Sequence, residues 1–230
     1  MSLYAIGDLH FSTSVDKPMD IFGEKWAGHE TKIINDWSEK ITQDDMVLVL
    51  GDTSWGINLQ EAKSDLEIIH KLPGDKIFIK GNHDYWWTTV TGLNKLYDNM
   101  RFLQTNFYEY KDYAICGGRG WNCPNSVKFD ENDKKIYIRE ENRLRLSLEA
   151  ARKKGYSKLI VITHYPPTND QLEESLFTKL YEEYNVEKVI YGHLHGKESF
   201  KMGLKGNRNG VEYVLASCDY TDFKLIKIMD

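Results

Sequence analysis

Short apolar runs that each end in a polar motif are the feature of this chain that most limits its fold. Five such runs, rich in Val, Ile and Leu, cover residues 3–6, 46–50, 76–79, 159–162 and 189–191. Nearly continuous runs of this length are typical of strands buried on both faces. Patterns with helical spacing lie between or beside them, at 29–40, 59–72, 139–154 and 171–184. This alternation predicts an α/β layered fold with largely parallel strand pairing.

The rest of the sequence predicts further strands and one long loop. Closely spaced strands with hairpin signals are expected at 101–105, 107–110 and 113–117, and Asn209-Gly210 predicts a tight turn before strands at 211–217 and 223–228. Asp170 and Glu173 have the form of a capping box for the helix at 171–184. The polar stretch 122–135 is expected to be a long surface loop. We therefore expect two packed sheets with helices outside, in a single domain over residues 1–230.

Residues with metal-ligand chemistry follow the five apolar runs. The motifs are Asp8-Leu-His10, Gly51-Asp52, Gly81-Asn82-His83-Asp84, His164 and Gly192-His193-Leu-His195. Side chains alternate along an extended segment, so Asp8 and His10 are expected on one side of it. Gly51 would let the backbone turn so that the Asp52 carboxylate faces the site. Because ligands bind beyond the carboxyl ends of strands in such sheets, we expect all these side chains to share one site.

The donor types and their order favour a metal site over separate structural roles. A single histidine at a strand end is more often structural than a ligand, and a lone Gly-Asp is usually a turn. The whole set in one order, each motif just after a strand-like run, instead predicts two groups of ligands that share Asp52. Oxygen and imidazole donors with no thiolate suit Mn, Fe, Zn or Co. Two such ions about 3.5–4 Å apart are a known arrangement for in-line attack on phosphorus esters.

This motif set resembles that of the calcineurin-like metallophosphoesterases, and the likeness extends from Asp8 to His195. The resemblance implies an α/β fold, a four-layer α/β/β/α sandwich of two mixed sheets flanked by helices, with a dinuclear metal site at the sheet edge. It implies two divalent or mixed-valence metal ions, with Mn, Fe or Zn expected. One ion would be held by Asp8, His10, Asp52 and His195, and the other by Asp52, Asn82, His164 and His193.

The resemblance also implies an activity. A metal-bridging hydroxide would attack a phosphomonoester or phosphodiester, and His83 would contact the phosphate and assist the leaving group. Asp84, next to His83 in sequence, is expected to orient it. The stretch Gly51-Asp52-Thr53-Ser54-Trp55-Gly56 lacks the acidic and basic residues usual at the second motif. Small bacterial phosphohydrolases of the family are therefore a better match than its protein phosphatases.

Charge and composition limit the classes of substrate and partner that we expect. The net charge of −5 and scattered Lys and Arg residues argue against a long polyanion as substrate. A small phosphorylated substrate is the expectation, with a nuclease and a non-catalytic metal-binding adaptor as alternatives. No apolar run approaches the ~18 residues that span a bilayer. With three cysteines and no signal-like N-terminus, we expect reduced thiols and a cytoplasmic location without membrane contact. The oligomeric state is left open.

Aromatic residues gather near the predicted site loops. Trp55, Trp86, Trp87 and Trp121 all lie on or near the motif loops. They would either pack these loops against the core or form an aromatic wall that stacks on a base or aryl leaving group. Arg119 would either contact a substrate phosphate or form a structural ion pair. His29 and His70 fall on predicted helices and are assigned no role.

Overall fold

Two β-sheets pack face to face at the centre of the protein. The computed structural model describes residues 1–125 and 129–230. The first sheet has the order β11 (Ile226–Met229), β1 (Leu3–Ile6), β2 (Met46–Val49), β3 (Asp75–Phe78) and β4 (Met100–Phe102). The second has the order β5 (Phe107–Tyr110), β6 (Tyr113–Gly118), β7 (Lys158–Thr163), β8 (Lys188–Tyr191), β10 (Val211–Leu215) and β9 (Gly206–Arg208). Both sheets are mixed: their inner pairs are parallel, whereas β11, β5 and β9 pair antiparallel with their neighbours.

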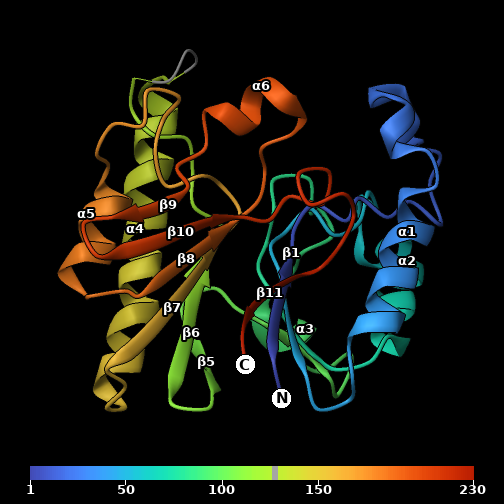
Figure 1. The fold of residues 1–230 in the computed structure, drawn as a ribbon, viewed down its shortest axis with the longest axis horizontal. Helices are drawn as coiled ribbons and strands as arrows, with labels where there is room; N and C mark the ends of the chain where they lie inside the picture. The colour runs from blue at the N-terminus through green and yellow to red at the C-terminus, as the bar shows by residue number, and fades with distance from the viewer. Residues whose placement is uncertain (126–128) are drawn as a thin grey trace.

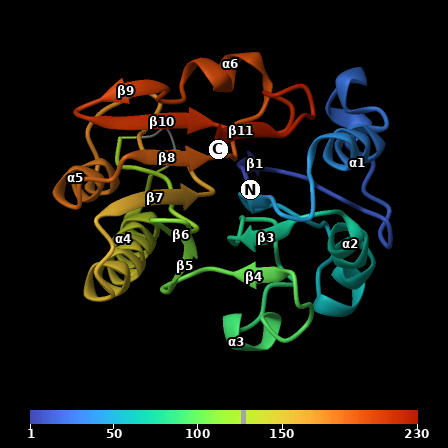
Figure 2. The same cartoon turned by 60° about the horizontal axis from the view of Figure 1, so that its bottom comes forward.

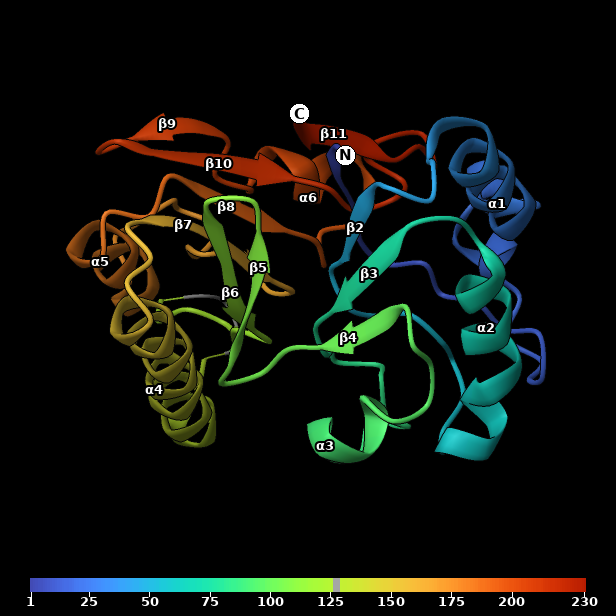
Figure 3. The same cartoon turned by 90° about the horizontal axis from the view of Figure 1, so that it is seen from below.

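Helices cover the outer face of each sheet (Figure 1). α1 (His29–Lys40) and α2 (Leu59–Lys71) lie over the first sheet, and α4 (Glu131–Lys153) and α5 (Leu176–Glu183) lie over the second. The short helices are α3 (Val90–Leu93) and α6 (Gly196–Lys201), and two 3-10 turns, η1 (Met19–Phe22) and η2 (Glu24–Trp26), precede α1. Figure 3 shows the two sheets between the two helix layers, which is the expected α/β/β/α order. The predicted four-layer fold is confirmed.

The alternation of side chains along each strand explains the layers. In β1, Leu3 and Ala5 point into the core between the sheets, while Tyr4 and Ile6 point to the helices. In β7, Ile160 and Ile162 enter the inner core, whereas Leu159 and Val161 contact the α4 and α5 layer. Each central strand is therefore apolar on both faces, which accounts for the continuous apolar runs in the sequence.

Several predicted boundaries are wrong. α4 begins at Glu131 rather than 139, because Asp130 and Asp133 form a capping box there, so residues 131–135 are helix and not loop. Residues 126–128 of that expected loop lie outside the described residues. α5 begins at Leu176, after a capping box of Ser175 and Thr178, and not at a cap formed by Asp170 and Glu173. β4 pairs in parallel with β3 in the first sheet instead of joining a hairpin with β5.

Other local predictions are confirmed. α1 spans the predicted residues, and α2 ends one residue earlier than predicted. Asn209 and Gly210 both have positive φ, as the tight turn between β9 and β10 requires. The two chain ends lie side by side, since β1 pairs with β11 (Figure 2). Among helices in the described part of the chain, none has both the length and the apolar character needed to cross a bilayer.

The two sheets approach each other at the carboxyl ends of β1 and β10. The Gly7 N–H donates to the carbonyl of Ala216 at 2.7 Å, and the Cys218 N–H donates to the carbonyl of Gly7 at 3.0 Å. Gly7 and Ser217 form a parallel bridge between the sheets. The loops that follow the strands of both sheets are thereby brought to one edge.

Candidate metal centre

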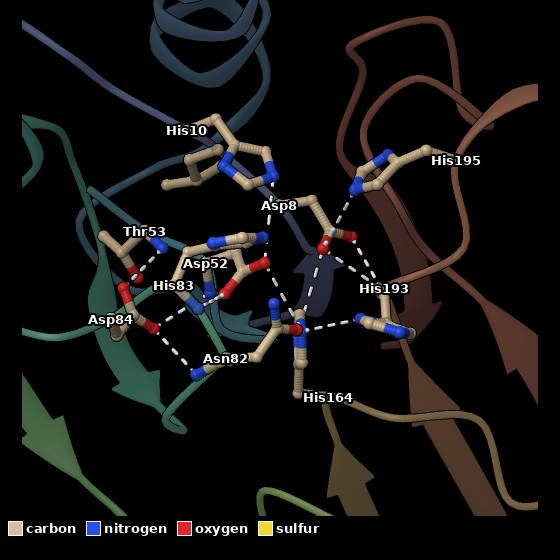
Figure 4. A network of polar contacts seen from close by, with 12 residues as sticks. Asp8, His10, Asp52, Thr53, Asn82, His83, Asp84, His164, His193 and His195 are labelled. Atoms are coloured by element: carbon tan, nitrogen blue, oxygen red, sulfur yellow. Dashed lines mark hydrogen bonds and ion pairs between the residues drawn. The ribbon is translucent and has the colours of Figure 1, made fainter. Parts of the chain in front are cut away.

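Loops from both sheets bring the seven predicted ligands together at this edge (Figure 4). The first sheet contributes the residues after β1, β2 and β3, and the second those after β7 and β8. The side chains of Asp8, His10, Asp52 and His164 are nearly fully buried. The side chains form two groups that lie next to each other, one around Asp8 and one around His164.

The backbone at the site is held in an uncommon conformation. Asp8, His10, Asp52 and His193 all have positive φ, at 62°, 48°, 49° and 71°. Residues other than glycine rarely adopt this region, and such strain is concentrated at functional sites. The expectation that Asp8 and His10 converge through strand alternation is therefore wrong, because left-handed turns aim both side chains. Hydrogen bonds from Asp8 N to Gly51 O (3.0 Å) and from His10 N to Asp52 O (2.9 Å) hold the two loops together.

Two glycines leave room for the carboxylates. A Cβ on Gly81 would lie 2.1 Å from Asp52 Oδ1, and one on Gly192 would lie 2.6 Å from Asp8 Oδ2. Both distances are far below contact distance, so only glycine allows each carboxylate to reach its position. Gly51, with φ of +84°, makes the turn into Asp52 as the sequence indicated.

The first ligand group consists of Asp8, His10 and His195, whose ligand atoms lie within 4.8 Å of one another. His195 Nε2 lies 3.5 Å from Asp8 Oδ1, while the other ring nitrogen contacts Asp219. Figure 4 shows Asp8 between the His10 and His195 rings. The His193 N–H donates to the Asp8 carboxylate at 3.0 Å, which fixes that carboxylate from the second sheet.

The second group gathers around His164. Its Nδ1 contacts the carbonyl of Leu50 at 2.9 Å, so Nε2 is the nitrogen that faces the site. Nε2 lies 2.7 Å from Asn82 Oδ1, 3.1 Å from His193 Nδ1 and 3.5 Å from Asp52 Oδ2. Asp52 Oδ2 also lies 3.8 Å from His10 Nε2, which places this oxygen between the two groups. The ligand atoms of Asp8, Asp52 and His164 also lie within 4.8 Å of one another.

The buried charges are poorly balanced by the protein alone. Burial and the charge of Asp8 raise the pKa of Asp52 to about 8. Burial opposes charge on His195, yet Asp8 and the Asp219 hydrogen bond raise the pKa of His195 to about 10. Burial and the neighbouring His164 lower the pKa of His193 to about 3, so His193 is neutral. Cations bound to these residues would favour the deprotonated ligands and offset the charge of both carboxylates.

The residues present fit divalent cations. Carboxylate, amide and neutral imidazole donors converge at short distances, and glycines clear the space beside both carboxylates. His164 and His195 each have their second ring nitrogen in contact with an oxygen, the arrangement that fixes metal-binding imidazoles. Oxygen and imidazole donors of this kind bind divalent metal ions.

Asp84 supports the backbone of the site. Its carboxylate accepts hydrogen bonds from the N–H groups of Asp52 (2.9 Å), Thr53 (2.8 Å) and Gly81 (2.7 Å) and from Trp86 Nε1 (2.9 Å). Within residues 1–125 and 129–230, no hydrogen bond joins Asp84 to the His83 ring. The expectation that Asp84 orients His83 directly is corrected accordingly: Asp84 holds the loops after β2 and β3 in register, as Figure 4 shows.

His83 lies at the border of the site with its ring half-buried. Its N–H donates to Asp52 Oδ1 at 2.8 Å, which links its position to a predicted ligand. The ring centroid is 4.5 Å from that of Trp55 and 5.8 Å from that of His10. Burial and the neighbouring His164 lower the pKa of His83 below its ordinary value. A neutral imidazole with an N–H is thus available beside the ligands.

Sequence reasoning missed three supporting residues. Asp219 contacts His195 Nδ1 at 2.9 Å and accepts from the Gly196 N–H at 3.0 Å. Its signal was available, because Asp219 comes two residues after the predicted strand 211–217. His29, assigned no role, has Nε2 3.0 Å from the carbonyl of Leu9 and so supports the turn that carries His10. Trp26 packs edge-on against His195 with centroids 5.5 Å apart, and no motif marked it.

Of the four tryptophans near the motif loops, some pack these loops against the core and one forms part of the wall of the site. Trp86 and Trp87 are buried against Phe102 and pack the loops. Trp121 donates to Asp133 at 2.8 Å and lies below the Arg119 guanidinium. Trp55 stacks on His10 with centroids 4.8 Å apart and planes at 23°, so it belongs to the site wall.

Arg119 lies 3.5 Å from Glu140, which agrees with the structural ion-pair interpretation.

The three cysteines are buried and free, as expected for reduced thiols. Burial raises the pKa values of Cys116 and Cys123 to about 12. These two thiols are therefore poor nucleophiles at neutral pH.

Known proteins share this chain's sequence features and fold. The family model described as calcineurin-like phosphoesterase matches residues 1–197. The Gene 66 protein of Mycobacterium phage D29 is 25% identical over 182 residues, which are 75% of this chain and 69% of the phage protein.

Two solved structures are similar in fold. A protein of unknown function from Aquifex aeolicus has a TM-score of 0.54 at 20% identity, covering 98% of this chain and 95% of its own. The phosphopantetheinyl hydrolase of Mycobacterium tuberculosis has a TM-score of 0.55 at 15% identity, covering 99% and 95%. At these identities both demonstrate a shared fold.

Proposed function

Because the chain belongs to the calcineurin-like phosphoesterase family, we propose that it is a dinuclear metal-dependent phosphoesterase acting on a small phosphomonoester or phosphodiester. The observation that carries this proposal is the pair of adjacent ligand groups, with Asp52 Oδ2 between them and the His83 ring at their border. A single structural ion would not require two such groups. Buried free thiols agree with a reducing compartment, and we infer a cytoplasmic location from them.

The ligands can be assigned to two ions from the ring nitrogen or oxygen that each side chain turns towards the site. Asp8, His10 and His195 would hold one ion, and Asn82, His164 and His193 the other, with Asp52 shared. Asp8 Oδ1 also lies 3.8 Å from His164, but through Nδ1, which is already in contact with Leu50. Sharing through Asp52 is therefore favoured. Mn, Fe or Zn are the proposed ions.

The residues of the chain then position the substrate and the leaving group. When bound, the ions would supply Lewis-acid chemistry, offsetting phosphoryl charge and making a water nucleophilic near neutral pH. Asp52 holds the His83 backbone through Oδ1, so the imidazole stays beside the phosphoryl position. The His83 N–H would donate a hydrogen bond or proton to the leaving oxygen. Trp55 covers one side of His10 and His83 and excludes water there.

The experiment is hydrolysis of p-nitrophenyl phosphate and bis-p-nitrophenyl phosphate by metal-stripped protein with Mn, Fe, Zn, Co or Mg added back. Turnover that depends on added metal supports the proposal, and the ratio of the two rates distinguishes monoesterase from diesterase. Absence of turnover with every metal, in protein that binds two ions, would contradict it and favour a metal-binding adaptor.

A further inference from the structure

A cavity of about 330 Å³ opens directly beside the proposed reaction centre. Part of its wall is formed by the three histidines His10, His83 and His195. Because His83 is the proposed donor to the leaving oxygen, the group attached to that oxygen has to extend into this cavity. The cavity therefore determines which leaving groups fit, and the inference drawn from it rests on the proposed function.

The rest of the wall is mainly apolar and aromatic. It is formed by Met19, Phe22 and Trp26 from the 3-10 turns η1 and η2, together with Trp55 from the loop after β2. Trp26 and Met19 are buried, whereas the Phe22 ring is 65% exposed at the rim. Gly23, with φ of 126°, joins the two turns and so lets Phe22 and Trp26 face the same cavity.

The two tryptophan rings of the wall are packed against their neighbours. Trp55 Nε1 contacts Met19 Sδ at 3.3 Å, and the Trp55 ring is stacked on His10. Trp26 packs edge-on against both His195 (5.5 Å between centroids) and Phe223 (5.2 Å). Preformed aromatic surfaces of this kind bind flat rings by stacking and edge-to-face contacts.

The charges of the wall disfavour an anionic leaving group. Neither lysine nor arginine lines the cavity among the described residues, and its one carboxylate, Asp219, already contacts His195 and Gly196. A second phosphate or carboxylate would meet this acidic group with neither a lysine nor an arginine in the wall to pair with. A sugar would lose hydrogen bonds to water against Met19, Phe22 and the indoles without replacing them.

We propose that this cavity, lined by Phe22, Trp26 and Trp55, binds a flat, uncharged aromatic group carried by the leaving alcohol of the substrate. The volume is at the lower end of ligand pockets, which suits a group of one or two rings. The substrate class is accordingly an aromatic phosphoester whose ring lies on the side of His83.

Three phosphate esters with leaving alcohols of similar acidity test the proposal. They are 2-phenylethyl, 2-cyclohexylethyl and ethyl phosphate, each also supplied as its methyl diester. The phenyl ester should have a kcat/KM about tenfold or more above that of the ethyl ester, and about threefold or more above that of the cyclohexyl ester. A merely apolar cavity would favour the phenyl over the ethyl ester but would not distinguish the phenyl from the cyclohexyl ester.

Two neighbouring exposed residues give a matched pair of variants. Phe22→Leu retains apolar bulk but removes the ring, and it should reduce the phenyl-to-cyclohexyl ratio of the wild type by about twofold or more. Ile21→Ala is the control, because Ile21 is 72% exposed in the same turn and does not line the cavity. Its ratio should equal that of the wild type. Equal kcat/KM for the three esters, or an unchanged ratio in Phe22→Leu, would overturn the proposal.

Binding of the non-hydrolysable 2-phenylethylphosphonate and ethylphosphonate to metal-loaded protein separates this inference from the proposed function. A Kd about tenfold lower for the phenyl compound, weakened in Phe22→Leu, supports the aromatic cavity even if no ester is hydrolysed. Equal affinity for the two phosphonates in a protein that does hydrolyse esters would overturn the cavity assignment and leave the enzyme activity in place.

Discussion

Asp52 connects the two ligand groups to each other and to His83. Its Oδ2 faces His10 and His164, while its Oδ1 accepts the His83 N–H. Its own N–H donates to Asp84, and its carbonyl accepts the His10 N–H. A shift of this residue would thus move both ligand groups and the His83 ring together.

His83→Ala should retain bound metal but lower the hydrolysis rate by roughly 10²–10⁴-fold, because it removes the leaving-group donor and no predicted ligand. Rates would be compared for p-nitrophenyl phosphate and for an ester with a more basic leaving alcohol, and the loss should be greater for the latter. His70→Ala is the control, since His70 lies on α2 and contacts Asn99. A rate near wild type for the basic leaving group would disprove the donor role.

Asp84→Asn should destabilise the protein and weaken metal binding without touching a ligand. In asparagine only the amide oxygen accepts hydrogen bonds, whereas both carboxylate oxygens of Asp84 do. The variant would therefore leave some of the donors on Asp52, Thr53, Gly81 and Trp86 unpaired. Each buried donor left unpaired costs about 1–3 kcal/mol. Urea unfolding and metal content would be measured beside Asp112→Asn, which alters an exposed carboxylate paired with Lys158. Wild-type stability and metal content in Asp84→Asn would show that Asp84 does not hold the loops.

At the scale of elements, the turn after each parallel strand decides where its ligand lies. The loop after β3 passes so close to the loop after β2 that position 81 admits no Cβ. Gly81→Ala should therefore displace Asp52 and abolish both metal binding and hydrolysis. Gly118→Ala is a matched control, because its Cβ would lie 3.5 Å from the Gln104 carbonyl, an ordinary contact. Metal content and activity at wild-type level in Gly81→Ala would contradict the tight crossing.

The sequence predicted the central strands well because burial on both faces leaves a continuous apolar run. It failed where local and distant contacts decide the boundary. The first turns of α4 are polar in sequence, yet the Asp130 capping box and the bond from Trp121 to Asp133 stabilise them. The α5 start depends on Ser175 and on the Tyr137 hydroxyl, which accepts the Leu176 N–H. Such tertiary partners have no signature in a single sequence.

The candidate site was predictable to a similar degree. The ligand residues follow predicted strands, so parallel pairing brings those of each sheet to one edge, and the bridge between Gly7 and Ser217 brings the two edges together. The aiming of Asp8 and His10 was not predictable, because it depends on left-handed backbone and not on alternation. The cavity wall was not predictable from the sequence either, because Phe22 and Trp26 belong to irregular 3-10 turns.

For the whole molecule, each sheet provides part of the site. The first sheet contributes Asp8, His10, Asp52 and Asn82, and the second His164, His193 and His195. The inner core between the sheets and the bridge of Gly7 and Ser217 set their separation. Bound ions would link the two sheets, so metal should raise the stability of the folded protein.

The most direct test of the account is the number of metal ions per chain, measured by mass spectrometry after reconstitution and removal of free metal. The account predicts about two ions in the wild type and about one in both His10→Ala and His193→Ala, because each variant disrupts a different ligand group. It also predicts a further loss in Asp52→Asn, which affects both groups. One ion or none in the wild type, or two ions retained in both histidine variants, would contradict the dinuclear centre.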